Sequence, residues 1–310
     1  LHNNRHSFPT RRSSDLEGHG LAARQVDARL LIHSATRSTL QLRTGRVSLP
    51  DSLREQAGAL QGIALTCANP VVREPLLACP RLSLELRTQK FATLKAEAQL
   101  RYDMQRESLQ AHGTGPAIAG AIPTFTLAHS PRGWKAEASL PPLPVAAWQS
   151  FLKPWFTVPD SLSLAGETKL AVQAEGDANG TRAMVDVALR DGGFQNADFT
   201  WLAEKLELAA HASVDLSDPL SFSATITGTQ GQALAGPVVL DFSANPLELD
   251  ARGRFTPAQL DIEHFQGRQK ELAEVSGTAR VTLAPFSVAS ASLDARDIRF
   301  PAAYVTYLQQ

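Results

Sequence analysis

The side chains that could carry acid–base, nucleophilic or metal chemistry are scattered along this chain. Six of its eight histidines lie beyond residue 16, and each stands alone: His19, His33, His112, His129, His211 and His264. A zinc site needs ligands at short, regular spacing, and general acid–base catalysis needs a paired partner. Nucleophile-elbow, phosphate-loop, His-Glu-x-x-His and dinucleotide-binding glycine patterns do not occur in the sequence. We therefore expect a non-enzymatic protein, with no catalytic residues, no metal and no cofactor.

The acidic residues offer no better site. Glu204, Glu207 and Asp215 fall on stretches of alternating polarity, where a solvated face accounts for them. The segment Asp177-Ala178-Asn179-Gly180 resembles the start of a calcium loop, but the required downstream glutamate is missing. A plain turn is the better interpretation.

The two cysteines, Cys67 and Cys79, are the only ones in the chain and bracket a loop that contains Asn69, Pro70 and Pro75. Short apolar runs flank this loop, as in a hairpin whose strands bring two sulfurs within bonding distance. We expect a disulfide, which indicates an oxidising compartment, here the bacterial periplasm. The alternative is two unrelated reduced thiols.

The first sixteen residues carry a different kind of signal. The run from His6 to Leu16 matches one translated frame of a common sequencing adapter, so we treat residues 1–16 as an artefactual, disordered prefix. Without that prefix the chain has 27 basic and 30 acidic side chains, a net charge of −3. Such a balance, with no basic patch, argues against a nucleic-acid partner. We expect residues 17–310 to form one domain that is a fragment truncated at both ends.

From Val26 onward, apolar and polar residues alternate with a period of two, which is typical of strands with one dry and one wet face. The stretch from Leu94 to Tyr102 is a clear case. Gly, Pro, Asn and Asp separate the stretches, as short antiparallel connections require. The pattern predicts about fifteen strands in a meandering antiparallel sheet.

One stretch has helical spacing: Val145, Trp148, Phe151 and Leu152 recur on one side between Pro144 and Pro154. We expect a helical insertion near residues 144–155, either plugging the sheet or acting as a gate that contacts lipid. A weaker helical pattern covers residues 52–61.

A sheet of this size exposes a large apolar face, which could pack on a second sheet as a sandwich or curl into an open groove. Many residues of that face are alanine, which leaves room in a groove. We therefore expect a mainly β fold: an elongated, curved antiparallel sheet forming an open groove, a β-taco or half-barrel, with one or two short helices.

The chain resembles the AsmA-like bridge-like lipid-transfer family of Gram-negative bacteria from about Leu162 onward. The resemblance lies in strand–turn–strand units with a late glycine, such as Val185 to Gly193, Phe222 to Gly236 and Leu247 to Gly253. The closing stretch from Ser292 to Leu308 is most similar to the YdbH branch.

Membership would imply a periplasmic groove that carries phospholipid acyl chains between the inner and outer membranes. It would also imply an inner-membrane anchor upstream of this chain and a partner protein at the outer membrane.

On this hypothesis the apolar strand faces line the groove, although the pattern does not fix which face points inward. The candidate lining residues are Val185, Val187, Leu189, Leu206, Leu208, Val214, Phe222, Ile226, Leu247 and Leu249. The main alternative is a scaffold of the cell envelope, acting in outer-membrane biogenesis without handling lipid. A secreted β-helical carbohydrate enzyme is a third alternative, and it would require clustered carboxylates.

Overall fold

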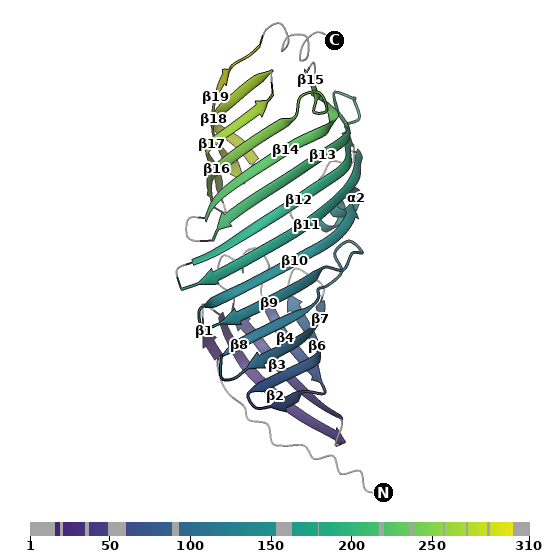
Figure 1. Cartoon of the computed structure of the whole chain (residues 1–310), viewed down its shortest axis with the longest axis vertical. Helices are drawn as coiled ribbons and strands as arrows, with labels where there is room; N and C mark the ends of the chain where they lie inside the picture. The colour runs from purple at the N-terminus through teal and green to yellow at the C-terminus, as the bar shows by residue number, and fades with distance from the viewer. Residues whose placement is uncertain are drawn as a thin grey trace. The chain divides into compact units, whose positions relative to one another are not determined.

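The computed structural model (Figure 1) describes residues 16–18, 21–34, 37–48, 60–88, 93–152, 163–178, 180–216, 220–235, 238–256, 258–270, 272–283 and 286–299. Most of these residues lie in long antiparallel strands, and the sheet is open and curved rather than closed. The predicted mainly β fold, an open curved sheet with little helix, is confirmed.

Contacts along the chain divide it into two compact units. Unit 1 comprises Leu1–Ala117 and Ile122–Ala136, and unit 2 comprises Ile118–Ala121 and Glu137–Gln310. The boundary falls inside strand β10 (Gly133–Pro144), not in a Gly- or Pro-rich linker. From the sequence we expected one domain from residue 17.

Unit 1 is a meander of short and medium strands. In chain order they are β1 (Leu16–Gly18), β2 (Leu21–Ser34), β3 (Arg37–Ser48), β4 (Leu60–Ala68), β5 (Val71–Arg73), β6 (Leu76–Thr88), β7 (Leu94–Asp103), β8 (Ser108–Thr114) and β9 (Thr124–Ser130). Each strand pairs with the next, except that β4 pairs with β6 and β5 forms a small hairpin with β6. In β7 the predicted alternation appears directly, because Leu94, Ala96 and Ala98 are half-buried while Lys95 and Glu97 are exposed.

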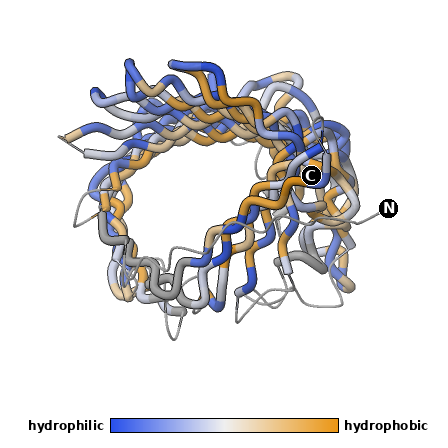
Figure 2. Tube along the Cα trace, turned by 90° about the horizontal axis from the view of Figure 1, so that it is seen from below, coloured by the Kyte–Doolittle hydropathy of each residue, from blue (hydrophilic) through white to orange (hydrophobic). Residues whose placement is uncertain are grey.

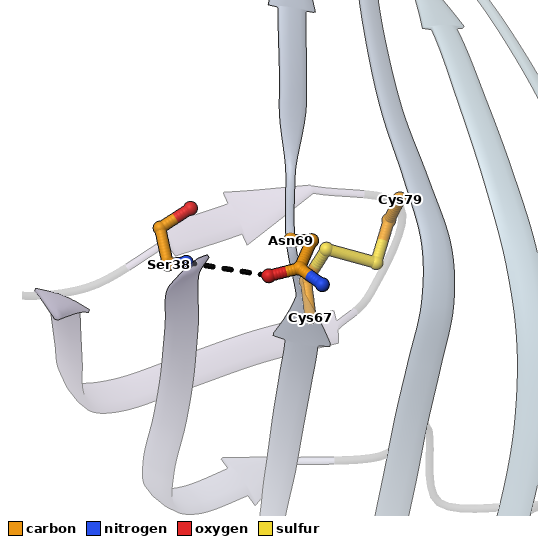
Figure 3. Close-up of a disulfide and its surroundings, with 4 residues drawn as sticks. All are labelled: Ser38, Cys67, Asn69 and Cys79. Atoms are coloured by element: carbon orange, nitrogen blue, oxygen red, sulfur yellow. Dashed lines mark hydrogen bonds between the residues drawn. A yellow bond between two sulfur atoms is a disulfide. The ribbon is translucent and has the colours of Figure 1, made fainter. Parts of the chain in front are cut away.

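The predicted disulfide joins β4 to β6 (Figure 3). The Cα atoms of Cys67 and Cys79 are 5.8 Å apart, and both side chains are 5% exposed. Next to it, Asn69 Oδ1 accepts a hydrogen bond from Ser38 N at 3.3 Å, and Asn69 N donates to Ser38 O at 2.8 Å. The loop that follows Cys67 is thus fastened both to β6 and to the start of β3.

Unit 2 holds the longer strands. After β10 and helix α2 (Val145–Leu152) come β11 (Ser163–Asp177), β12 (Gly180–Gln195), β13 (Trp201–Asp215), β14 (Leu220–Ala235), β15 (Val238–Asp241), β16 (Leu247–Phe255), β17 (Gln259–Gln269), β18 (Ala273–Leu283) and β19 (Phe286–Arg296). From β11 onward each strand pairs antiparallel with the next, with β15 as a side branch because β14 also pairs with β16.

The element predictions had mixed outcomes. The helix exists as α2, but Pro144 is the last residue of β10 and not part of the first helical turn. Most of the weaker helix at 52–61 lies outside the described residues, and its last two positions belong to β4 instead. Leu16, which we assigned to the prefix, pairs with Ala23 as part of β1.

Candidate functional site: an apolar face on unit 2

Strand register brings the apolar residues of unit 2 into rows that cross the sheet. Residues directly opposite each other on neighbouring strands point to the same face, and so do residues two apart on one strand. We name each row after its residue on β11. The Leu170 row comprises Leu170, Val187, Ala210, Ile226, Leu249, Gly267, Val275 and Ala295.

Three further rows flank it on the same face. The Val172 row comprises Val172, Val185, Ala212, Ala224, Ala251, Phe265, Gly277 and Leu293. The Ala174 row comprises Ala174, Ala183, Val214, Phe222, Gly253, Ile262, Ala279 and Ala291. The Thr168 row comprises Thr168, Leu189, Leu208, Gly228, Leu247, Gln269 and Ala273.

These four rows form the apolar face of unit 2. Figure 2 shows hydrophobic and hydrophilic positions alternating along the strands and gathering on opposite sides of them. Of the ten lining residues expected from the sequence, nine lie in these rows. The structure therefore brings the predicted residues together on one continuous surface.

This face is not sealed like the core of a sandwich. Val187, Ile226 and Leu249 are half-buried, as are the alanines of the Val172 row. Among the described residues, no large side chain is less than 2% exposed. The hydrophobic residues that are nearly buried, at 2–9% exposure, are few: Cys67, Cys79, Ala111, Leu140, Leu143, Ala203, Leu206, Phe242 and Leu272. A close-packed second layer would have buried the centre of the face.

Leu206 differs from the other nine candidates. Lys205 has a positive φ of 53°, and the β13–β14 register shifts between Glu204 and Glu207. Leu206 lies at this irregularity and is 5% exposed, in a cluster with Ala203 and Phe242. It is therefore a packing residue and not part of an accessible wall.

Phe242 closes one margin of the face. Its side chain is 5% exposed and lies over the Thr168 row, where Leu189, Leu208 and Leu247 pack against the cluster. Phe242 lies over Gly228, where a Cβ would be in ordinary contact with Phe242 Cγ at 3.6 Å and tight against Leu208 Cδ2 at 3.1 Å. We missed Phe242 from the sequence, since it belongs to a turn and not to an alternating strand.

The turn that carries Phe242, residues 241–245, is here called the capping turn. Asp241 Oδ1 accepts hydrogen bonds from Ser243 N at 2.9 Å and Ala244 N at 3.0 Å, and Gln232 Nε2 donates to Asp241 Oδ2 at 3.0 Å. The Ala244 N–H has the largest effect in holding the pKa of Asp241 below its usual value, with Gln232 and Ser243 adding to it and burial opposing it. The ionised carboxylate thus fixes the capping turn.

Helix α2 lies at the same margin. Trp148 Nε1 donates to Thr168 Oγ1 at 2.5 Å, and Thr168 Oγ1 donates to the carbonyl of Leu143 at 3.3 Å. Because Thr168 belongs to the apolar face, these bonds place the start of α2 against it. Val145, Ala147 and Trp148 are half-buried, and the side chains of residues 149–152 lie outside the description.

The opposite face of unit 2 is polar and carries a His–Asp pair of the kind used in catalysis. His211 Nδ1 is 2.7 Å from Asp186 Oδ1, and Thr225 is the direct partner of His211 on β14. Thr225 Oγ1, however, donates to Asp250 Oδ1 at 2.7 Å, so its proton is directed away from His211. His211 and Asp186 are also 56% and 51% exposed, and the surrounding depression is shallow. Nothing in this geometry activates a nucleophile.

Unit 1 has an apolar face of the same construction. One of its rows comprises Leu30, Leu40, Cys67, Leu82, Ala98, Gly113 and Phe125. The disulfide therefore lies on the apolar side of this sheet.

Comparison with known proteins gives no relative, because no family model, no curated protein and no solved structure matches this chain. In the described ranges no helix is long and apolar enough to cross a bilayer. Among the same residues, no group of three or more His, Cys, Asp or Glu side chains is placed to hold a metal ion.

Proposed function

We propose that this chain is part of a non-enzymatic lipid-transfer protein that carries phospholipid acyl chains along its apolar face. The observation that carries the proposal is the set of rows on unit 2. They cross up to eight strands and are apolar at nearly every position, and their side chains are mostly half-buried from β11 to β18 and exposed on β19 in the described structure.

The dimensions suit an acyl chain. Seven intervals of about 4.8 Å give each long row a length of roughly 34 Å. One leaflet's share of a bilayer core is about 15 Å, so a lipid tail fits along a row with space to slide. Ala212, Ala224 and Ala251 leave the middle of the Val172 row recessed between larger side chains such as Ile226 and Phe222.

The energetics fit transport as well. Each methylene group removed from water gains about 0.8 kcal/mol, and the gain is similar anywhere along a uniform apolar row. A tail is therefore held strongly but not at one place, while a headgroup stays in water at the open side. Such sliding requires no reacting group on the protein.

The disulfide supports an oxidising compartment for the proposed activity. Cys67 and Cys79 lie on an apolar face at bonding distance, and disulfides persist in oxidising compartments such as the periplasm. We therefore place this activity in the periplasm of a Gram-negative bacterium, between inner and outer membranes. The resemblance to the AsmA-like family adds an inner-membrane anchor and an outer-membrane partner to the proposal.

The test is lipid uptake by the oxidised protein. Vesicles containing a fluorescent phosphatidylethanolamine are mixed with the protein, and protein-bound fluorescence is measured after the vesicles are removed. Ala224→Trp should block uptake because it fills the middle of the Val172 row. Thr225→Trp, one residue away on the polar face, is the matched control and should leave uptake unchanged.

An envelope scaffold gives the opposite pattern. In that case the unmodified protein takes up no fluorescent lipid, organic extracts of it contain no phospholipid by mass spectrometry, and Ala224→Trp has no more effect than Thr225→Trp. Lipid uptake by the Ala224→Trp variant equal to that of the unmodified protein would also overturn the proposal.

A further inference from the structure

The Thr168 row contains two polar side chains, and each fastens a segment that covers the apolar face. Thr168, at one end of the row, accepts the Trp148 hydrogen bond from α2. Gln269, near the other end, is 6% exposed, and its Nε2 donates to the carbonyl of Asn245 in the capping turn at 2.9 Å. Polar groups on an otherwise apolar wall require partners, and here the partners are the two covering segments.

The capping turn is held firmly. Phe242 is buried in the cluster, Phe242 N donates to Gly231 O at 2.9 Å, and Gly231 N donates to Ser243 Oγ at 3.1 Å. Opening this segment would break those bonds and expose the cluster. It is a fixed margin of the face.

Helix α2 is attached differently. The strand before it is anchored, because Leu140 and Leu143 are 3% and 4% exposed. In the described part of the helix, Val145–Trp148, the side chains are half-buried or exposed, and Trp148 donates a hydrogen bond to Thr168 on the wall. These helical side chains are thus packed less deeply than the base at residues 140–143.

We propose that α2 is a lid on the apolar face, with Leu140–Leu143 as its base and the Trp148–Thr168 hydrogen bond as its latch. The lid closes over the Thr168 row when the face is empty, which shields apolar surface from water. An acyl chain that enters there displaces the helix and covers the same surface. This inference rests on the proposed function and adds a gating step to it.

The first test weakens the latch. Thr168→Val keeps the shape of the side chain but removes the hydroxyl, and with it the bond to the Leu143 carbonyl, whereas Trp148→Phe removes only the indole N–H. Losing one hydrogen bond of ordinary strength should increase the population of the open lid by about two- to ten-fold. Initial uptake of the fluorescent phosphatidylethanolamine should rise by that factor in both variants. Thr225→Val, which removes a hydrogen-bonded hydroxyl from the polar face, is the control and should not change the rate.

The second test observes the helix directly. Hydrogen–deuterium exchange of the full chain is compared with and without vesicle-derived phosphatidylethanolamine. The proposal predicts faster exchange in α2 and unchanged exchange in the capping turn when lipid is bound. Slower or unchanged exchange in α2, or uptake by Thr168→Val no faster than by Thr225→Val, overturns the lid while lipid binding itself stands. If the unmodified protein takes up no lipid, the lid and the proposed function both fail.

Discussion

The stability of a Val187→Asp variant distinguishes an open apolar wall from a sealed core. Val187 is half-buried, and its direct neighbours across the sheet are Leu170 and Ala210. Full burial of a valine contributes about 1.5–3 kcal/mol. Because Val187 is only partly buried and the new carboxylate keeps its water, we expect Val187→Asp to lower the free energy of unfolding by about 1 kcal/mol.

The same change at Leu206 should behave very differently. Leu206 is 5% exposed and packs on Ala203 and Phe242. Losing a buried leucine costs about 2–5 kcal/mol, and burying an unpaired carboxylate adds several more. Together these approach the whole stability of a typical domain, about 5–15 kcal/mol. We expect Leu206→Asp to unfold unit 2.

Urea unfolding followed by circular dichroism at pH 7 measures both effects, and lipid uptake is measured on the folded variant. Val187→Asp should remain folded and lose uptake, since the charge interrupts the Leu170 row. Ala188→Asp, on the opposite face of β12, should keep both stability and uptake. If Val187→Asp is as damaging to stability as Leu206→Asp, the face is packed in solution and our reasoning is refuted.

Three further predictions concern individual contacts. Replacing both Cys67 and Cys79 by serine should lower the free energy of unfolding by about 3 kcal/mol, from the loop entropy of their 12-residue separation, and should abolish the response to reductant in urea titrations. Thr44 Oγ1 is buried without a hydrogen-bond partner, so Thr44→Val should raise the free energy of unfolding by about 1 kcal/mol, and a loss would contradict that assignment. The pKa of Asp241 is lowered in the folded state, so its contribution to stability is complete above about pH 4 and is lost as pH falls through the folded value. The unfolding midpoints of the unmodified protein and Asp241→Asn should therefore differ at pH 6 and converge in acid, and a gap that persists in acid would count against the role of the carboxylate.

The arrangement of the apolar face was predictable because it depends on a local rule. Alternation with a period of two assigns each side chain to a face, and a regular antiparallel register then aligns those faces between strands. Val187, Ile226 and Leu249 accordingly fall in one row, as the pattern indicates. The disulfide was predictable for a similar reason, since Cys67 and Cys79 bracket a short hairpin loop.

The covering segments were not predictable because they depend on contacts between distant residues. The alternation of polar and apolar residues does not predict the irregularity at Lys205, because of which Leu206 packs in the cluster and does not line the face. Phe242 has no periodic partner in the sequence, and only the structure shows that it lies over Gly228. Helical spacing indicated α2 but not the hydrogen bond from Trp148 that fixes its position on the sheet.

The central claim is that lipid tails contact one face of this sheet and not the other. A photo-activatable benzoylphenylalanine placed at Ile226 or at Thr225 samples the two faces from adjacent positions on β14. After illumination of the protein in bacterial envelopes, mass spectrometry should find phospholipid attached at Ile226 and none at Thr225. Equal labelling at both positions, or no lipid at Ile226, would contradict the account.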